Sequence, residues 1–216
     1  MGKRHWLKGL GAGLLALMLV LTGCTGGGDQ SSSQASEPES SQTAGTDETA
    51  IPTLYIGTYD DEGNGTFTEY PFVSSGELTP ESLISAMAEL TGWDLTLSSD
   101  DPVTTGKGGM TVSFAPESAI FTGPPEEQKD EFHVYSSDQL CFEIFDSIQK
   151  TLQENFSPAN PSALDVYYCT DGSTEIELPD LGVVVPIDEP YSHALFEQLL
   201  MSAVIAEPEE SSEPAA

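Results

Sequence analysis

Apolar side chains are distributed along this 216-residue chain so that only one part of it can bury a core. Residues 25–50 are dominated by Gly, Ser, Gln, Glu, Thr and Ala and contain no aromatic or branched apolar residue. Residues 207–216 are acidic and contain two prolines. Such segments cannot bury enough apolar surface to offset the entropy lost on ordering. We therefore expect one domain, residues 51–206, between a disordered Ser/Gly/Glu-rich tether (24–50) and a disordered acidic tail.

The first residues have the pattern of a bacterial lipoprotein signal peptide. Three basic residues open the chain: Lys3, Arg4 and Lys8. An apolar run follows over residues 9–21, which is shorter than the roughly 20 apolar residues that span a membrane. The run ends in Leu21-Thr22-Gly23-Cys24, which is similar to the lipobox, with small residues before the cut and a thiol after it. We expect residues 1–23 to be removed and Cys24 to carry the lipid; an ordinary signal peptide or an uncleaved anchor is the alternative.

Lipidation would place the protein outside the cytoplasm, anchored to the bacterial cell membrane. Two acyl chains anchor a protein stably where one does not. A diacylated Cys24, carrying fatty acids such as palmitate, would therefore hold the domain at the membrane without a transmembrane helix.

Charge excludes one class of partner. The chain carries 36 Asp and Glu against 6 Lys and Arg, a formal net charge of -30. After loss of the leader, the only cations are Lys107, Lys129 and Lys150. Such a surface repels phosphate backbones, so we expect no nucleic acid to bind. Solubility is the simplest explanation of the charge, and a basic partner or divalent cations are the functional alternatives.

The first half of the domain predicts a hairpin and a helix. Residues 52–58 and 66–73 read as strands joined by a turn at Asn64-Gly65, with Pro71 at a strand end or edge. A helix is expected from Thr79 to Gly92 because Thr caps, Pro suits the first turn and Gly ends helices. Further strands are expected at residues 94–98 and 109–114, which could pair with each other.

The second half predicts a long helix, further strands and a terminal helix. Helical apolar spacing begins after a capping Ser136 and runs to about Asn155. Residues 163–169 and 174–178 read as a hairpin, with a short strand at 183–185 and a helix at 191–205. The predicted fold class is therefore α+β: a small, mostly antiparallel sheet with two main helices packed on one face, plus a C-terminal helix.

Several short motifs resemble the GerMN (sporulation and germination) domain family. They include Leu54-Tyr55, Leu78-Thr79-Pro80-Glu81, Thr111-Val112-Ser113-Phe114, Ile148-Gln149-Lys150-Thr151-Leu152 and Asp171-Gly172. The resemblance covers roughly residues 52–190. It implies a protein-interaction module of lipoproteins and spore-envelope proteins, with no catalytic residues.

Metal and cofactor chemistry has little support in the sequence. Asp60, Glu62 and Asn64 fall at the first offsets of a calcium loop, but the closing bidentate acid would fall on Pro71. A hairpin turn explains the same residues, so we expect no metal and no cofactor.

Two cysteines, Cys141 and Cys169, remain in the mature chain. An extracytoplasmic location permits a disulfide between them. Two buried free thiols are the alternative.

An enzyme is not expected, because no G-x-S-x-G elbow is present and the two mature histidines, His133 and His193, read as surface residues. The leading hypothesis is a tethered scaffold that binds another envelope or spore-assembly protein, for example by strand addition at a sheet edge. The alternative is a lipoprotein that binds cations or a small ligand.

Overall fold

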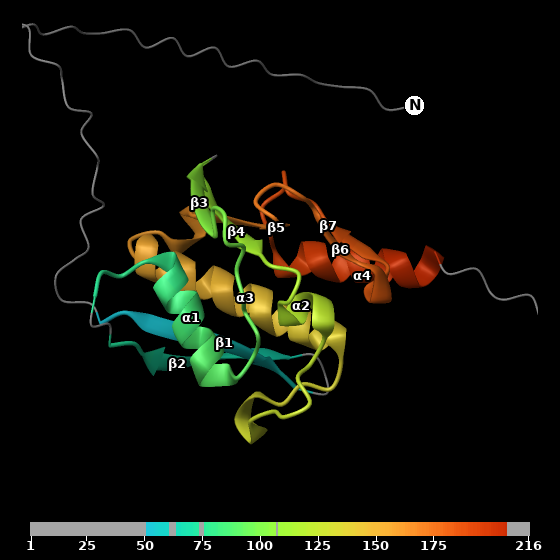
Figure 1. The fold of residues 1–216 in the computed structure, drawn as a ribbon, viewed down its shortest axis with the longest axis horizontal. Helices are drawn as coiled ribbons and strands as arrows, with labels where there is room; N and C mark the ends of the chain where they lie inside the picture. Colours follow the sequence, from blue (N-terminus) through green and yellow to red (C-terminus); the bar gives the residue numbers. More distant parts are fainter. Residues whose placement is uncertain (1–50, 61–63, 74–75, 107, 207–216) are drawn as a thin grey trace, which may run out of the picture. The chain divides into compact units, whose positions relative to one another are not determined.

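A computed structural model describes residues 51–60, 64–73, 76–106 and 108–206. The predicted leader, Cys24, the tether and the acidic tail all lie outside these residues. The described part has the predicted α+β character (Figure 1).

The first element is the predicted hairpin. Strand β1 (Thr53–Tyr59) pairs antiparallel with β2 (Gly65–Pro71), with Tyr59 opposite Gly65. Leu54 and Ile56 point into the core, whereas Gly65 to Glu69 are all exposed. Apolar residues alternate in β1 because only one face of this strand meets the core.

Helix α1 (Pro80–Thr91) begins and ends as the sequence predicts. The Thr79 hydroxyl accepts from the Ser82 amide, and the Ser82 hydroxyl accepts from the Thr79 amide, which closes a capping box. Gly92 ends the helix at a φ of 85°, a left-handed conformation that glycine adopts without strain.

The second sheet has the order β3–β4–β5, formed by β3 (Val103–Gly106), β4 (Gly109–Phe114) and β5 (Asp165–Thr170). The expected pairing of residues 94–98 with 109–114 is present only in part: Leu97 forms one antiparallel bridge with Phe114, the Ser98 amide donates to the Ser113 carbonyl and the Ala115 amide to the Thr96 carbonyl, but residues 94–98 do not form a full strand. The rest of β4 pairs antiparallel with β3, with Gly106 opposite Gly109 and Val103 opposite Val112. Strands β4 and β5 are parallel.

The connection from β4 to β5 is itself largely helical. It includes α2 (Ala119–Thr122), the 3-10 turn η1 (Asp130–Phe132), α3 (Ser137–Phe156) and η2 (Pro161–Ala163). A long crossover of this kind is what a parallel strand pair requires.

The third sheet pairs β6 (Ile176–Leu178) with β7 (Val183–Val185) around η3 (Pro179–Leu181). The expected hairpin of 163–169 with 174–178 is therefore wrong beyond one bridge, between Thr170 and Thr174. Strand β5 instead forms its ladder with β4, and β6 finds its partner across the shorter turn.

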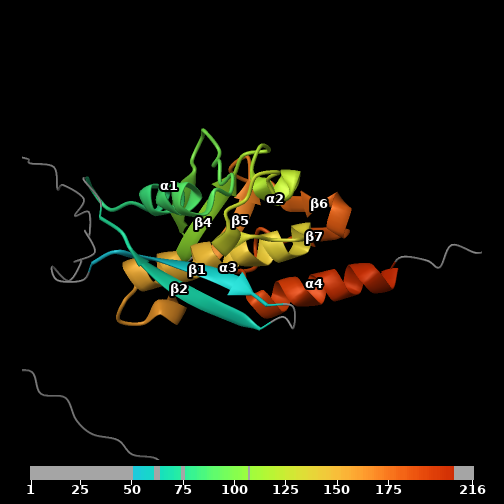
Figure 2. The ribbon, with the colours of Figure 1, turned by 90° about the horizontal axis from the view of Figure 1, so that it is seen from below.

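Helix α3 is the centre of the molecule, with strands on either side of it (Figure 2). Half of its 20 residues are buried. Helix α4 (His193–Ala206) packs against α3 and β7. The mostly antiparallel character is confirmed, but the strands form three small sheets rather than one.

Candidate functional site

The two edges of the β1–β2 hairpin differ. On β1, alternate backbone N–H groups donate to side chains of α3 that recur every four residues. Tyr59 donates to Glu143 at 3.3 Å, Gly57 to Ser147 at 2.8 Å, Tyr55 to Thr151 at 2.9 Å and Thr53 to Asn155 at 3.1 Å.

This pairing works because the two repeats nearly match. Four residues of helix rise about 6 Å, and two residues of strand rise about 6.6 Å. The contact is reciprocal at two positions, since Thr151 also donates to the Tyr55 carbonyl and Asn155 to the Thr53 carbonyl. Helix α3 thus takes the place of a neighbouring strand, and the outer edge of β1 is closed.

Strand β2 has its outer edge open within the described residues. Successive peptide groups of a strand point to opposite sides. Because Thr53, Tyr55 and Gly57 face α3, the residues between them face β2, and the Phe72 amide correspondingly donates to the Pro52 carbonyl. The register then turns the peptide groups of Gly65, Phe67, Glu69 and Pro71 outward.

Side chains on one face of the hairpin form an aromatic and cationic cluster with a side chain of α3. Phe67, 42% exposed, lies over Gly57, where an added Cβ would come within 3.2 Å of the ring. The Lys150 ammonium lies 5.2 Å from the centre of the Tyr55 ring and 5.8 Å from that of Phe67. Lys150 also pairs with Glu154 at 2.6 Å. The hairpin therefore presents outward backbone groups at the edge of β2 and an aromatic surface on the face that extends toward α3.

A second constellation surrounds Asp146, which is only 5% exposed. Its carboxylate accepts from the Tyr59 hydroxyl, from the Tyr191 hydroxyl at 2.7 Å, and pairs with His193 Nδ1 at 2.8 Å. Burial, followed by the charge of Asp146, raises the pKa of Tyr191 well above its usual value. Both tyrosines therefore remain protonated donors. The cluster joins β1, α3 and the start of α4.

Glu143 lies one turn before Asp146 and is 1% exposed. Its Oε1 accepts from the Tyr59 amide and from the Gln139 side chain at 3.0 Å. Among the described residues, its Oε2 has no partner. Burial raises the pKa of Glu143 to about 7, against the lowering effect of the two hydrogen bonds.

This arrangement orients a histidine but does not assemble a nucleophile. The Ser192 hydroxyl, next in sequence, accepts from the Leu195 amide. His193 lines neither the groove beside α1 nor the groove beside α2 that are described below. The prediction that His193 is simply a surface residue is incomplete: its ring is 43% exposed, but one nitrogen is held by a buried carboxylate. His133, in contrast, lies exposed against Tyr135.

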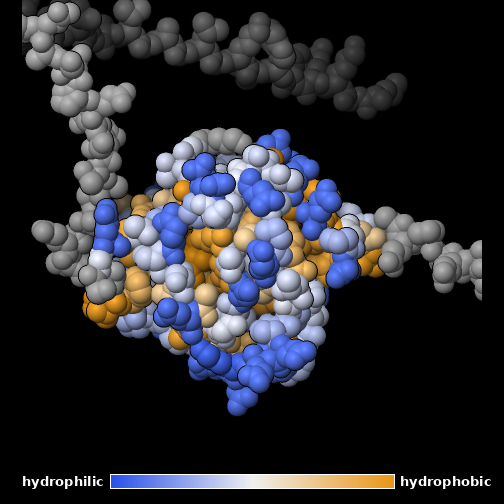
Figure 3. Space-filling model, viewed as in Figure 1, coloured by the Kyte–Doolittle hydropathy of each residue, from blue (hydrophilic) through white to orange (hydrophobic). Residues whose placement is uncertain are grey.

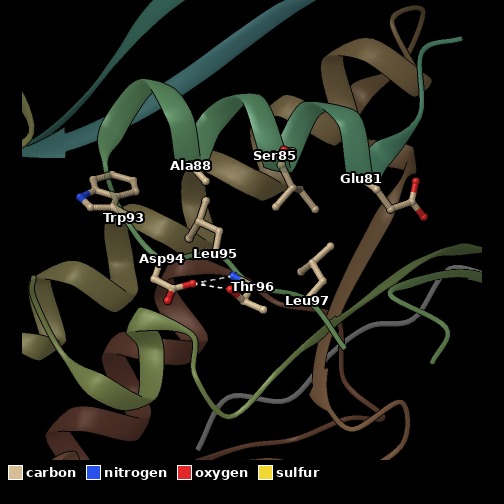
Figure 4. Close-up of a pocket in the computed structure, with 9 residues that line it drawn as sticks. Glu81, Ser85, Ala88, Trp93, Asp94, Leu95, Thr96 and Leu97 are labelled. Atoms are coloured by element: carbon tan, nitrogen blue, oxygen red, sulfur yellow. Dashed lines mark hydrogen bonds between the residues drawn. The ribbon is translucent and has the colours of Figure 1, made fainter. Parts of the chain in front are cut away.

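The first groove runs between α1 and residues 93–97 (Figure 4). The indole nitrogen of Trp93 is buried without a partner in the described part of the chain. Figure 4 shows this nitrogen turned away from the other labelled residues, so it does not point into the groove. The Asp94 carboxylate is occupied by the Thr96 amide and hydroxyl.

The second groove lies between α2 and the β6–η3 turn, with a volume of about 390 Å³. Apolar surface is also exposed where α4 ends (Figure 3). Its most exposed members are Met201, Val204 and Ile205.

In the structure Cys141 and Cys169 are free thiols rather than a disulfide pair. Both are buried, Cys141 against the Ile120 carbonyl and Cys169 beside Ser113. Cys141 thus faces α2, whereas Cys169 faces β4. Burial raises the pKa of the Cys141 thiol to about 12.

Two of the calcium-loop candidates, Asp60 and Asn64, bind each other. Asp60 accepts from the amide and side chain of Asn64, at 2.8 Å and 3.1–3.2 Å. Glu62 lies outside the described residues. No group of three metal-ligating side chains occurs in the part of the chain that the structure describes.

The lipobox residues Leu21, Thr22 and Gly23 and the lipid-attachment residue Cys24 also lie outside the described residues. Within residues 51–206, as far as they are described, no helix has the length and apolar content needed to cross a membrane.

Comparison with known proteins gives no relative: no family model matches the chain, and neither a curated protein nor a solved structure matches it. The site must therefore be interpreted from its own chemistry.

Proposed function

We propose that this chain is an extracytoplasmic lipoprotein, anchored through Cys24, whose domain binds another envelope protein by adding a strand to β2. The observation that carries the proposal is the difference between the two hairpin edges. The edge of β1 is occupied by four side chains of α3, whereas the outward groups of β2 have no strand partner among the described residues.

Open edges recruit strands from other chains, and proteins usually block them with charges, bulges or covering loops. Strand β2 carries only Glu69 as a charged residue, and Pro71 removes a single donor at its end. Phe67, an exposed aromatic residue of β2 itself, offers apolar contact to a side chain of an incoming strand. The GerMN resemblance supports the same kind of role and is the source of the envelope and sporulation context.

The test uses a proline that blocks only the outer edge. The Glu69 amide points outward, so Glu69→Pro removes a donor for the partner and leaves the β1–β2 ladder intact. Glu69→Gln is the matched control, because it removes the charge and keeps the amide. Both full-length variants are expressed in the native cell, with a photo-cross-linker replacing Thr66.

We expect one envelope protein to cross-link to the wild type and to Glu69→Gln, and to be lost in Glu69→Pro. Thermal unfolding of both variants checks that the hairpin survives. Equal capture by both variants would refute strand addition. If no protein partner is captured in growth or in starvation, the scaffold hypothesis is rejected, and the domain is then screened for binding of cations and small ligands.

A further inference from the structure

The groove between α2 and the β6–η3 turn has an apolar floor. Ile120 and Leu178 are 3% exposed and form its base, and Phe121 and Leu181 form half-buried walls. Its volume of about 390 Å³ falls within the roughly 300–1,000 Å³ of ligand pockets. It is large enough for an apolar side chain with the backbone beside it.

The rim of this groove is acidic. Asp171, Glu177 and Asp180 line it and are all exposed. No Lys, Arg or His is among its lining residues. The three carboxylates come from the β5–β6 turn, β6 and η3, so they are fixed by short backbone elements rather than by a long loop.

We propose that this groove is a second docking site, for a short basic and apolar segment of another protein. One apolar side chain of the segment enters between Phe121 and Leu181, and flanking Lys or Arg side chains lie against the rim carboxylates. Charge complementarity selects this occupant. An acidic segment would be repelled by the rim, and a wholly apolar one would leave the carboxylates without compensation.

A membrane surface is a poorer fit to the same chemistry. Anionic headgroups would meet three carboxylates and no cation in the groove. A bound metal ion is not supported either, since the described residues contain no cluster that could hold one.

The site is independent of strand addition at β2. Helix α2 and strand β6 lie away from β2 in both ribbon views (Figures 1 and 2). A protein with two such sites could bind one partner at two places or join two partners, and loss of one site need not affect the other.

The experiment measures binding of a fluorescein-labelled nonapeptide of alternating lysine and leucine to the full-length chain, by fluorescence anisotropy. One comparison peptide has glutamate in place of lysine, and another has serine in place of leucine. We expect only the lysine–leucine peptide to bind well, with a Kd on the order of 10 μM.

The decisive variant neutralises the rim: Asp171→Asn, Glu177→Gln and Asp180→Asn together. Asn suits position 171, whose φ is 49°. The matched control neutralises three exposed acids of the loop between α2 and α3: Glu126→Gln, Glu127→Gln and Glu131→Gln. It changes the net charge equally. We expect the rim variant to raise Kd about tenfold and the loop variant less than about twofold.

Four results would overturn the proposal. Two concern the variants: binding weakened equally by both triple variants, which indicates general attraction to an acidic protein, or binding not weakened by the rim variant. Two concern the peptides: the lysine–serine peptide binds as tightly as the lysine–leucine peptide, or the lysine–leucine peptide does not bind. Binding that is lost in Glu69→Pro but kept in the rim variant would assign the peptide to β2 instead.

Discussion

A single buried carboxylate holds three segments together. Asp146 is stable in the interior only because Tyr59, Tyr191 and His193 surround it, since an unpaired buried charge costs several kcal/mol. The sequence does not single out Asp146. It follows the apolar Ile144 and Phe145, and a carboxylate beside the apolar stripe of a helix usually lies on the exposed side.

Replacing Tyr191 by Phe tests the cluster. The ring is 4% exposed and keeps its packing, but Asp146 loses a 2.7 Å hydrogen bond. Hydrogen bonds to charged groups contribute about 1.5–3 kcal/mol. We expect Tyr191→Phe to lower the free energy of unfolding by that amount, measured by urea denaturation. Tyr135→Phe, at a ring 80% exposed, should change it by less than about 0.5 kcal/mol. Equal effects would contradict a structural role for the Asp146 cluster.

At the scale of elements, α3 performs two tasks with different faces. Its apolar stripe fills the core, and a polar row at four-residue spacing closes the edge of β1. The sequence contains that row, as Glu143, Ser147, Thr151 and Asn155, but polar residues on a helix usually indicate a solvated face. The four-residue spacing of this row was the available signal. It indicates a contact only once a strand is known to run alongside the helix.

Because buried hydroxyls help to close the edge of β1, removing one of them should lower the free energy of unfolding more than removing an exposed hydroxyl. Ser147 is fully buried and accepts from the Gly57 amide at 2.8 Å. Ser147→Ala would leave that amide without a partner, at a cost of about 1–3 kcal/mol. Ser202→Ala removes an exposed hydroxyl that donates to the Gln198 carbonyl and should cost less than about 0.5 kcal/mol. Urea denaturation of both variants checks this, and a cost below about 0.5 kcal/mol for Ser147→Ala would mean that water reaches the Gly57 amide.

Local signals predicted the elements well where chemistry is local. The Thr79 cap, the Gly92 stop and the Ser136 cap act within one helical turn, and the structure has all three. Strand pairing was predicted correctly for the β1–β2 hairpin, whose turn lies close by in sequence, but not for the strands whose partners are more distant. Residues 94–98 and 109–114 both have strand composition. Neither segment contains a signal that residues 103–106, which lie between them in the chain, pair with 109–112.

At the scale of the molecule, Glu143 links stability to pH. Burial raises its pKa from 4.5 to about 7, so between these values the folded chain holds a proton that the unfolded chain has lost. The folded state therefore binds more protons, and stability falls as pH rises from about 4.5 to 7. The loss is complete above pH 7 and amounts to about 1–3 kcal/mol.

Glu143→Gln should remove this dependence. The amide resembles the protonated carboxyl, since each has a donor where Oε2 lies and an oxygen that accepts from the Tyr59 amide. We expect similar stabilities for variant and wild type at pH 5, and a variant more stable by about 1–3 kcal/mol at pH 8, from urea denaturation at both pH values. The many other carboxylates add a general pH slope through mutual repulsion, and Glu117→Gln, at an exposed turn, controls for it. A difference between Glu143→Gln and wild type that does not change with pH would show that water or a cation already compensates the buried oxygen.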